Sequence, residues 1–120
     1  PRKIIRDVCA SVEQYKTGVP GLVPSDTVKL VDDDNIVIST LTRREVRLIQ
    51  TPQGFSMDLL LAAFEKAINE EYYGTDEASL VERTGTRVKL VEGSAENLKI
   101  TRPEDLECAR VFFKETAVKT

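Results

Sequence analysis

The sequence contains no histidine among its 120 residues, and this absence removes several kinds of chemistry at once. A Ser-His-Asp triad, a Cys-His pair and a His-based zinc site all require an imidazole side chain. A reaction carried by this chain must therefore use carboxylates, lysines, arginines or hydroxyls. It could also use a nucleophile that is already ionised at neutral pH and needs no base.

Cysteine is scarce, and long apolar runs are absent. Cys9 and Cys108 lie near opposite ends of the sequence and form no CxxC motif. Their separation favours two reduced, partly buried thiols over a disulfide or a metal site. No apolar run approaches the roughly 20 residues of a membrane span, and no signal peptide is visible. We therefore expect a cytoplasmic protein that does not bind a membrane.

Charge of one sign is also lacking. The 17 basic and 20 acidic residues give a net charge of −3, so a broad basic surface for nucleic acid is not expected. The 41% hydrophobic and 31% charged residues are typical of a globular domain, and the length fits one domain or part of a larger one. The sequence begins at Pro1 without a methionine, which is compatible with processing or with a longer parent protein.

The residues that are present predict alternating helices and strands. Helical spacing from Ile4 to Tyr15 predicts a helix that ends at Gly18, followed by a buried strand end at 21–24. The β-rich runs 27–30 and 36–40 flank a polar turn at 32–35 and predict a hairpin. The alternation predicts an α/β sheet. Two core strands are few for a sheet covered on both faces, so the fold is expected to be incomplete.

Three further helices and one strand follow the hairpin. Ser56 is predicted to cap a helix that runs to the polar stretch near residue 70. Thr75 is predicted to start a short helix that stops at Gly85, and residues 87–91 alternate as a half-buried strand does. Thr101 and Glu104 predict a capping box for the last helix.

The acidic cluster in the hairpin turn suggests a calcium loop, but the spacing excludes it. Such a loop needs glycine at its sixth position and glutamate at its twelfth. Counted from Asp32, these positions hold Val37 and Arg43. We therefore interpret the cluster as a solvated turn.

Three polar regions could carry chemistry: residues 42–47, residues 50–55, and a third pair of segments at 75–79 and 92–101. Residues 42–47 contain three arginines, which suits phosphate binding or a solvated basic turn. Residues 50–55 place a hydroxyl and backbone amides before a helix, which suits an anion site or a tight connection. Lys99 lies between Leu98 and Ile100 in an apparent strand, so it would face away from them and could reach a phosphate, although an ordinary exposed lysine fits the pattern too. The residues alone predict an α/β domain with a phosphate site and name no substrate.

Taken together, these stretches resemble the methylerythritol phosphate cytidylyltransferase family, whose members use CTP in non-mevalonate isoprenoid synthesis. The matching segments are SDTVK at 25–29, QTPQGF at 50–55, TDEAS at 75–79, VEG at 91–93, and NLKIT followed by PEDL at 97–106. Their order and spacing extend the resemblance over residues 1–120.

The resemblance implies that residues 1–120 are the C-terminal portion of one Rossmann-like nucleotidyltransferase domain. The hairpin at about 27–42 would project as an arm that joins a twin subunit in a homodimer. The family's N-terminal half carries a glycine-rich loop for CTP and an Asp-Ala-Ala-Arg-Pro segment, and neither occurs in this sequence. The fragment alone is therefore expected to be inactive.

The resemblance also assigns roles to single residues. Lys99 matches the lysine near the transferred phosphoryl group. Arg43 matches the arginine that follows the arm and reaches the partner's active site. Thr27, Thr51 and Thr75 match hydroxyls around the polyol phosphate.

The implied reaction is attack by the polyol's phosphate oxygen on the α-phosphate of CTP, with release of pyrophosphate. A phosphate monoester's second pKa is about 6, so the nucleophile is already anionic and needs no general base, in agreement with a histidine-free chain. Mg²⁺ is expected to be held through the CTP phosphates and the missing half, with no metal ligand in this chain. Arg44 and Arg47 match no family residue and are interpreted as surface charge.

Two alternatives stay open from the sequence. A ribitol 5-phosphate cytidylyltransferase shares the architecture and much of the motif set. The chain could also be a non-catalytic dimerisation module whose function lies in the arm.

Overall fold

The computed structural model describes the backbone of residues 2–119 and the side chains of residues 2–114. The elements follow in the order α1 (Arg2–Tyr15), β1 (Thr17–Leu22), β2 (Lys29–Val31), β3 (Val37–Thr40), the 3₁₀ turn η1 (Arg43–Glu45), β4 (Leu48–Ile49), β5 (Gly54–Phe55), α2 (Met57–Asn69), α3 (Glu77–Glu82), β6 (Leu90–Glu92) and α4 (Pro103–Lys119). The predicted α/β class and the alternation of elements are confirmed.

Strand β1 is the centre of a mixed sheet. It pairs in parallel with β6, with Val19 opposite Leu90, and antiparallel with both β4 and β5. The predicted strand at 87–91 is confirmed in kind but shifted, because ladder pairing begins only at Leu90. Just before Leu90, a side-chain hydrogen bond takes the place of strand pairing: the buried Thr17 hydroxyl accepts from the Lys89 amide at 2.9 Å.

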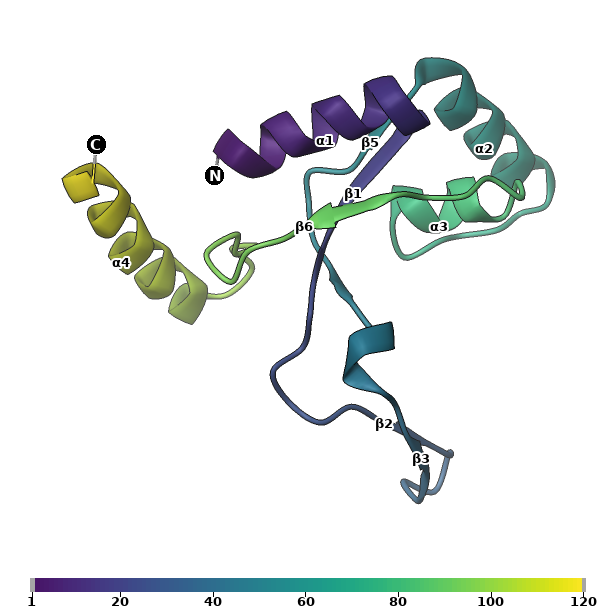
Figure 1. Cartoon of the computed structure of the whole chain (residues 1–120). Helices are drawn as coiled ribbons and strands as arrows, with labels where there is room; N and C mark the ends of the chain where they lie inside the picture. The colour runs from purple at the N-terminus through teal and green to yellow at the C-terminus, as the bar shows by residue number, and fades with distance from the viewer. Residues whose placement is uncertain (1, 120) are drawn as a thin grey trace.

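Helix α1 covers one face of the sheet and buries Ile4 and Val8 against β1 (Figure 1). The prediction that α1 ends at Gly18 is wrong. The helix stops at Tyr15, and Lys16 turns the chain with a φ of 67°. Gly18 instead lies within β1, where an added Cβ would be 2.7 Å from the Val8 carbonyl oxygen. Glycine is needed there for close approach of helix and strand, not to end a helix.

A second hydrophobic cluster joins α2 to α3. Ala63 and Ala67 of α2 meet Leu80 and Val81 of α3, and partly buried Phe55 closes one side. Small alanines let the two helices approach closely, so α3 and the loop before it are held firmly against α2.

The predicted start of α2 is confirmed in position but not in its capping hydrogen bond, and the predicted start of α3 is displaced by one residue. Ser56 occupies the N-cap position of α2, but its side chain makes no capping hydrogen bond. Asp76, not Thr75, caps α3: its Oδ1 accepts from the Ser79 amide at 2.8 Å within a reciprocal capping box. The cap therefore leaves the Thr75 hydroxyl outside the helix-starting motif.

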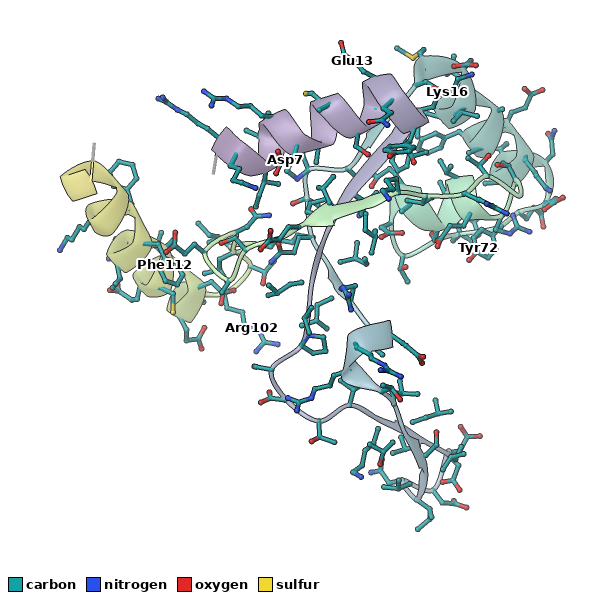
Figure 2. The ribbon with its side chains drawn as sticks, in the orientation of Figure 1. Asp7, Glu13, Lys16, Tyr72, Arg102 and Phe112 are labelled. Carbon is teal, nitrogen blue, oxygen red and sulfur yellow. The ribbon has the colours of Figure 1, made fainter. Side chains whose placement is uncertain are left out.

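The start of α4 also departs from the prediction. The carboxylate that accepts from the backbone amides before α4 belongs to Asp105 rather than to Glu104. Its Oδ2 accepts from the amides of Thr101 at 3.2 Å and Arg102 at 3.1 Å. These backbone hydrogen bonds, above all the one from Thr101, lower the pKa of Asp105 below its ordinary value. Phe112 of α4 lines a shallow hollow with Leu98, on the side of the helix that faces the body of the chain (Figure 2).

The predicted hairpin is confirmed and projects away from the sheet as an arm formed by β2 and β3 (Figure 1). Asp32 builds the predicted turn, because its Oδ1 accepts from the amides of Asp34 and Ile36, each at 2.9 Å. Between residues 29 and 40 the arm exposes five large apolar side chains: Leu30, Val31, Ile36, Val37 and Ile38. The radius of gyration is 16.8 Å, whereas a compact domain of this length measures about 13.6 Å.

Both cysteines are free thiols, but the prediction that they are partly buried is wrong, since Cys9 and Cys108 are exposed. Within the described part of the chain, no helix has the length and apolar content needed to cross a membrane.

Candidate functional site

An open cavity of about 630 Å³ lies where β1 ends. Three stretches that are far apart in the sequence form its walls: residues 48–53, residues 75–76 and residues 95–99. The first pairs with β1, the second leads into α3, and the third follows β6. Clefts at the ends of sheet strands are the usual binding position in α/β proteins.

Three of the five residues proposed from the sequence line this cavity. Thr51, Thr75 and Lys99 each come from a different wall. All three are exposed, and within the described residues their hydroxyl and ammonium groups have no hydrogen-bond or ion-pair partner. Two hydroxyls and one ammonium on residues that line one cavity suit a phosphate with attached hydroxyl groups.

Lys99 is exposed and lines the cavity, but the predicted strand around it is wrong. Residues 93–102 contain no strand, and Leu98 lines the same cavity as Lys99 rather than the opposite face. The alternation of Leu98, Lys99 and Ile100 imitates a strand, yet no neighbouring strand supplies a ladder. Side-chain hydrogen bonds hold the segment instead.

Gln50 provides several of those hydrogen bonds. Its Nε2 donates to the Ser94 carbonyl oxygen at 2.8 Å, and its Oε1 accepts from the Ser94 amide at 3.0 Å. Asn97 adds a hydrogen bond from its Nδ2 to the Thr51 carbonyl oxygen at 2.6 Å. The wall that carries Lys99 is thereby fastened to the wall that carries Thr51.

Gln53 connects Thr51 to the remaining wall. Its Nε2 donates to Asp76 Oδ2 at 3.0 Å, and its Oε1 accepts from the Ala78 amide at 3.1 Å. Neither Gln50 nor Gln53 stands out in the sequence as a site residue. The available signal was two amide side chains flanking a threonine-proline pair, but their partners are distant in sequence.

The other two proposed residues lie elsewhere. Arg43 is in η1 at the root of the arm, where its Nη1 donates to the Ser25 carbonyl oxygen at 2.7 Å. Thr27 is exposed in the connection between β1 and β2. Neither residue lines the cavity of its own chain.

The three arginines of residues 42–47 do not form one phosphate site. Arg44 and Arg47 line a separate hollow of about 680 Å³, together with Glu45 and Glu92, and Arg43 does not. Arg47 Nη1 is occupied by the carbonyl oxygens of Arg44 and Val46, at 2.9 and 2.8 Å. The carboxylates and the internal hydrogen bonds do not suit an anion site.

The side chains around the cavity do not fit a divalent cation. Asp76 is the one carboxylate among the described lining residues, and its two oxygens accept from Ser79 and Gln53. Within residues 2–114, no group of three or more histidine, cysteine, aspartate or glutamate side chains is placed to bind a metal.

The mixed sheet and its polar cavity define an α/β protein with one candidate binding site, and comparison with known proteins supplies the class. The family model for 2-C-methyl-D-erythritol 4-phosphate cytidylyltransferase matches residues 1–115. The chain belongs to this cytidylyltransferase family.

Relatives and solved structures agree. The chain is 43% identical over 114 residues to the 2-C-methyl-D-erythritol 4-phosphate cytidylyltransferase of Caldanaerobacter subterraneus subsp. tengcongensis, covering 95% of this chain and 50% of that protein. It is 46% identical over 112 residues to the Bacillus cereus protein of the same name, covering 93% and 49%. The crystal structure of 4-diphosphocytidyl-2C-methyl-D-erythritol synthase from Anaerococcus prevotii superposes with a TM-score of 0.85 at 33% identity, covering 93% and 52%. The chain thus spans about half the length of the curated relatives it matches.

Proposed function

We propose that this chain forms the polyol-phosphate side of an enzyme that transfers a cytidylyl group from CTP to 2-C-methyl-D-erythritol 4-phosphate and releases pyrophosphate. The observation that carries the proposal is the meeting of Thr51, Thr75 and Lys99 in one cavity. Their unoccupied polar groups suit a phosphorylated polyol, and the family membership supplies the reaction class.

In this reaction the chain would need only to position the polyol phosphate and to neutralise negative charge. The second pKa of a phosphate monoester is about 6, so most of the polyol phosphate is a dianion at neutral pH. No side chain therefore needs to remove a proton from it. Thr51 and Thr75 would hold the polyol phosphate by hydrogen bonds. Lys99 would neutralise charge that develops on the transferred phosphoryl group as it passes between two polyanions.

The remaining parts of the enzyme are proposed to lie outside this chain's cavity. The CTP pocket would belong to an N-terminal half that completes the nucleotidyltransferase domain, because the chain spans about half of its relatives. Mg²⁺ would be held by the CTP phosphates and that half, since the side chains of this cavity do not fit a metal. We place the enzyme in the bacterial cytoplasm, as its relatives are bacterial.

A homodimer through the arm completes the proposal. The arm exposes apolar side chains on both strands, which is typical of a surface covered by a partner. Arg43 stands at the root of the arm and outside its own chain's cavity. In a dimer joined by the arms, Arg43 could enter the partner's cavity, where it would add a second positive charge.

Turnover by the complete enzyme tests this function. With CTP as cosubstrate, methylerythritol phosphate should be converted at least tenfold faster than ribitol 5-phosphate, measured as pyrophosphate release. The opposite preference would assign the chain to ribitol 5-phosphate. No turnover of either compound by a folded dimer would support the alternative of a non-catalytic dimerisation module.

A further inference from the structure

The wall that carries Lys99 has no sheet pairing beyond Gly93, and one amide side chain takes the place of that pairing. The Gly93 amide makes the last backbone hydrogen bond between this wall and β1, donating to the Gly21 carbonyl oxygen at 2.9 Å. At the next residue, Ser94, both the amide and the carbonyl bind the side chain of Gln50. Gln50 therefore acts as a one-residue extension of the ladder.

Gln50 is itself held firmly enough for this task. Its own amide donates to the carbonyl oxygen of Pro20 at 2.9 Å, and Pro20 is fully buried in β1. Its Oε1 also accepts from Asn97 Nδ2 at 3.4 Å. A Cβ on Gly93 would collide with Gln50 Oε1, so the glycine at that position keeps space for the amide.

Gln53 makes the same kind of connection on the other side of Thr51. Its side chain donates to Asp76 and accepts from the Ala78 amide, so it fixes the segment that leads from Thr75 into α3. The Asp76 carboxylate that it binds is also the cap of α3. Both glutamines must donate and accept at once, which a carboxylate cannot do at neutral pH.

We propose that Gln50 and Gln53 are positioning residues for the transfer reaction, Gln50 for Lys99 and Gln53 for Thr75. The inference rests on the proposed function, because it assigns each glutamine an effect through a residue of that site. Neither glutamine needs to touch substrate. Loss of Gln50 should affect the rate of the chemical step, since Lys99 acts on the phosphoryl group. Loss of Gln53 should affect polyol-phosphate binding, since Thr75 holds that substrate.

The test uses the complete enzyme with Gln50→Met and Gln53→Met, which keep the side-chain length and remove both hydrogen-bonding functions. Gln14→Met is the matched control, because Gln14 is exposed on α1. We expect Gln50→Met to lower kcat at least tenfold with KM for the polyol phosphate changed less than threefold. We expect Gln53→Met to raise that KM at least fivefold with a smaller change in kcat. Gln14→Met should match the parent enzyme.

A double variant separates positioning from general support of the fold. If Gln50 acts through Lys99, adding Gln50→Met to Lys99→Ala should cause less than a twofold further loss of kcat. Full additivity of the two losses would overturn the inference, as would a Gln50→Met enzyme with the parent's kcat. Should Gln50→Met fail to fold, Gln50→Glu, which keeps the acceptor contacts, carries the same test.

A readout without turnover accompanies the kinetics. In Gln50→Met the hydrogen-bonded amides within residues 94–99, those of Ser94, Glu96, Asn97 and Leu98, should exchange with deuterium at least tenfold faster, while the amides of α2 keep the parent's rates. Unchanged exchange in residues 94–99 would overturn the inference. Failure of the proposed function is a distinct result, because the parent enzyme itself would then show no turnover.

Discussion

Replacing Lys99 by alanine should slow turnover far more than it weakens polyol-phosphate binding. Lys99 is the one cationic side chain among the described residues that line the cavity. A unit charge about 4 Å from the ammonium interacts with it by about 1 kcal/mol in water and about 4 kcal/mol near a protein surface. Lys99 is exposed, so we expect an intermediate loss of about 2–3 kcal/mol. This corresponds to a reduction in kcat of roughly 30- to 150-fold.

The effect on binding should be smaller, because Thr51 and Thr75 remain to hold the ground-state phosphate. The assay is pyrophosphate release by the complete enzyme under saturating CTP, with polyol-phosphate affinity measured separately by calorimetry. Lys114→Ala serves as the matched control, since it removes the same charge from the exposed side of α4. Equal rates for Lys99→Ala and the parent would refute the role. So would a large loss of affinity with unchanged kcat, which would make Lys99 a binding group only.

Three further outcomes are expected. A mixed dimer can be made in which one subunit carries both Arg43→Ala and an inactive CTP site, while the other subunit is unchanged. If Arg43 acts across the interface, the one intact CTP site receives the mutated arginine, so activity should vanish. Activity near half of the parent's would show that Arg43 acts within its own subunit. Gly18→Ala should destabilise the chain by about 1–3 kcal/mol in urea unfolding, because the new Cβ would lie 2.7 Å from the Val8 carbonyl oxygen, and an unchanged midpoint would contradict that contact. The Thr101 amide, followed by the Arg102 amide, holds the pKa of Asp105 below 3.8, so its stabilisation of the start of α4 should be complete above pH 3.8 and lost as pH falls through the lowered pKa. In a Thr101→Pro variant, carbon NMR titration should find this pKa raised toward its ordinary value, and an unchanged pKa would contradict the hydrogen bond from Thr101.

Much of the fold could be predicted because its signals are local. The amphipathic spacing of α1, the turn built by Asp32, and the apolar stripe of α2 each specify an element within a few residues of sequence. Errors arose where a local pattern has two uses. Gly18 resembles a helix terminator, yet its position is required by the approach of Val8 from another element. Helix starts were displaced by one residue for the same reason, since Thr75 and Asp76 are both good caps in isolation.

The candidate site was only partly predictable. Thr51, Thr75 and Lys99 were named from the resemblance, and the structure places them around one cavity. What joins them could not be read from the sequence, because Gln50 binds Ser94 and Gln53 binds Asp76 across long separations. An amide in a loop is unremarkable until its partners are known. The strand predicted around Lys99 failed for the same reason. The alternating pattern is local, but a strand also needs a neighbouring strand to pair with, and residues 93–102 have none.

The five proposed residues fall into two groups, and this division is relevant to the proposed dimer. Three converge within one chain, whereas Arg43 and Thr27 lie beside the root of a projecting arm and outside the cavity. If the site lay within one chain, Arg43 would have no role in it and would only make its hydrogen bond to Ser25. In the proposed dimer, the exposed apolar arm would bring Arg43 to a second cavity, where Lys99 alone would otherwise face two polyanions. One added positive charge is the change that such a reaction most needs. The proposed dimer would therefore account for the exposed arm and for Arg43 together, since one interface would also complete the neighbouring site.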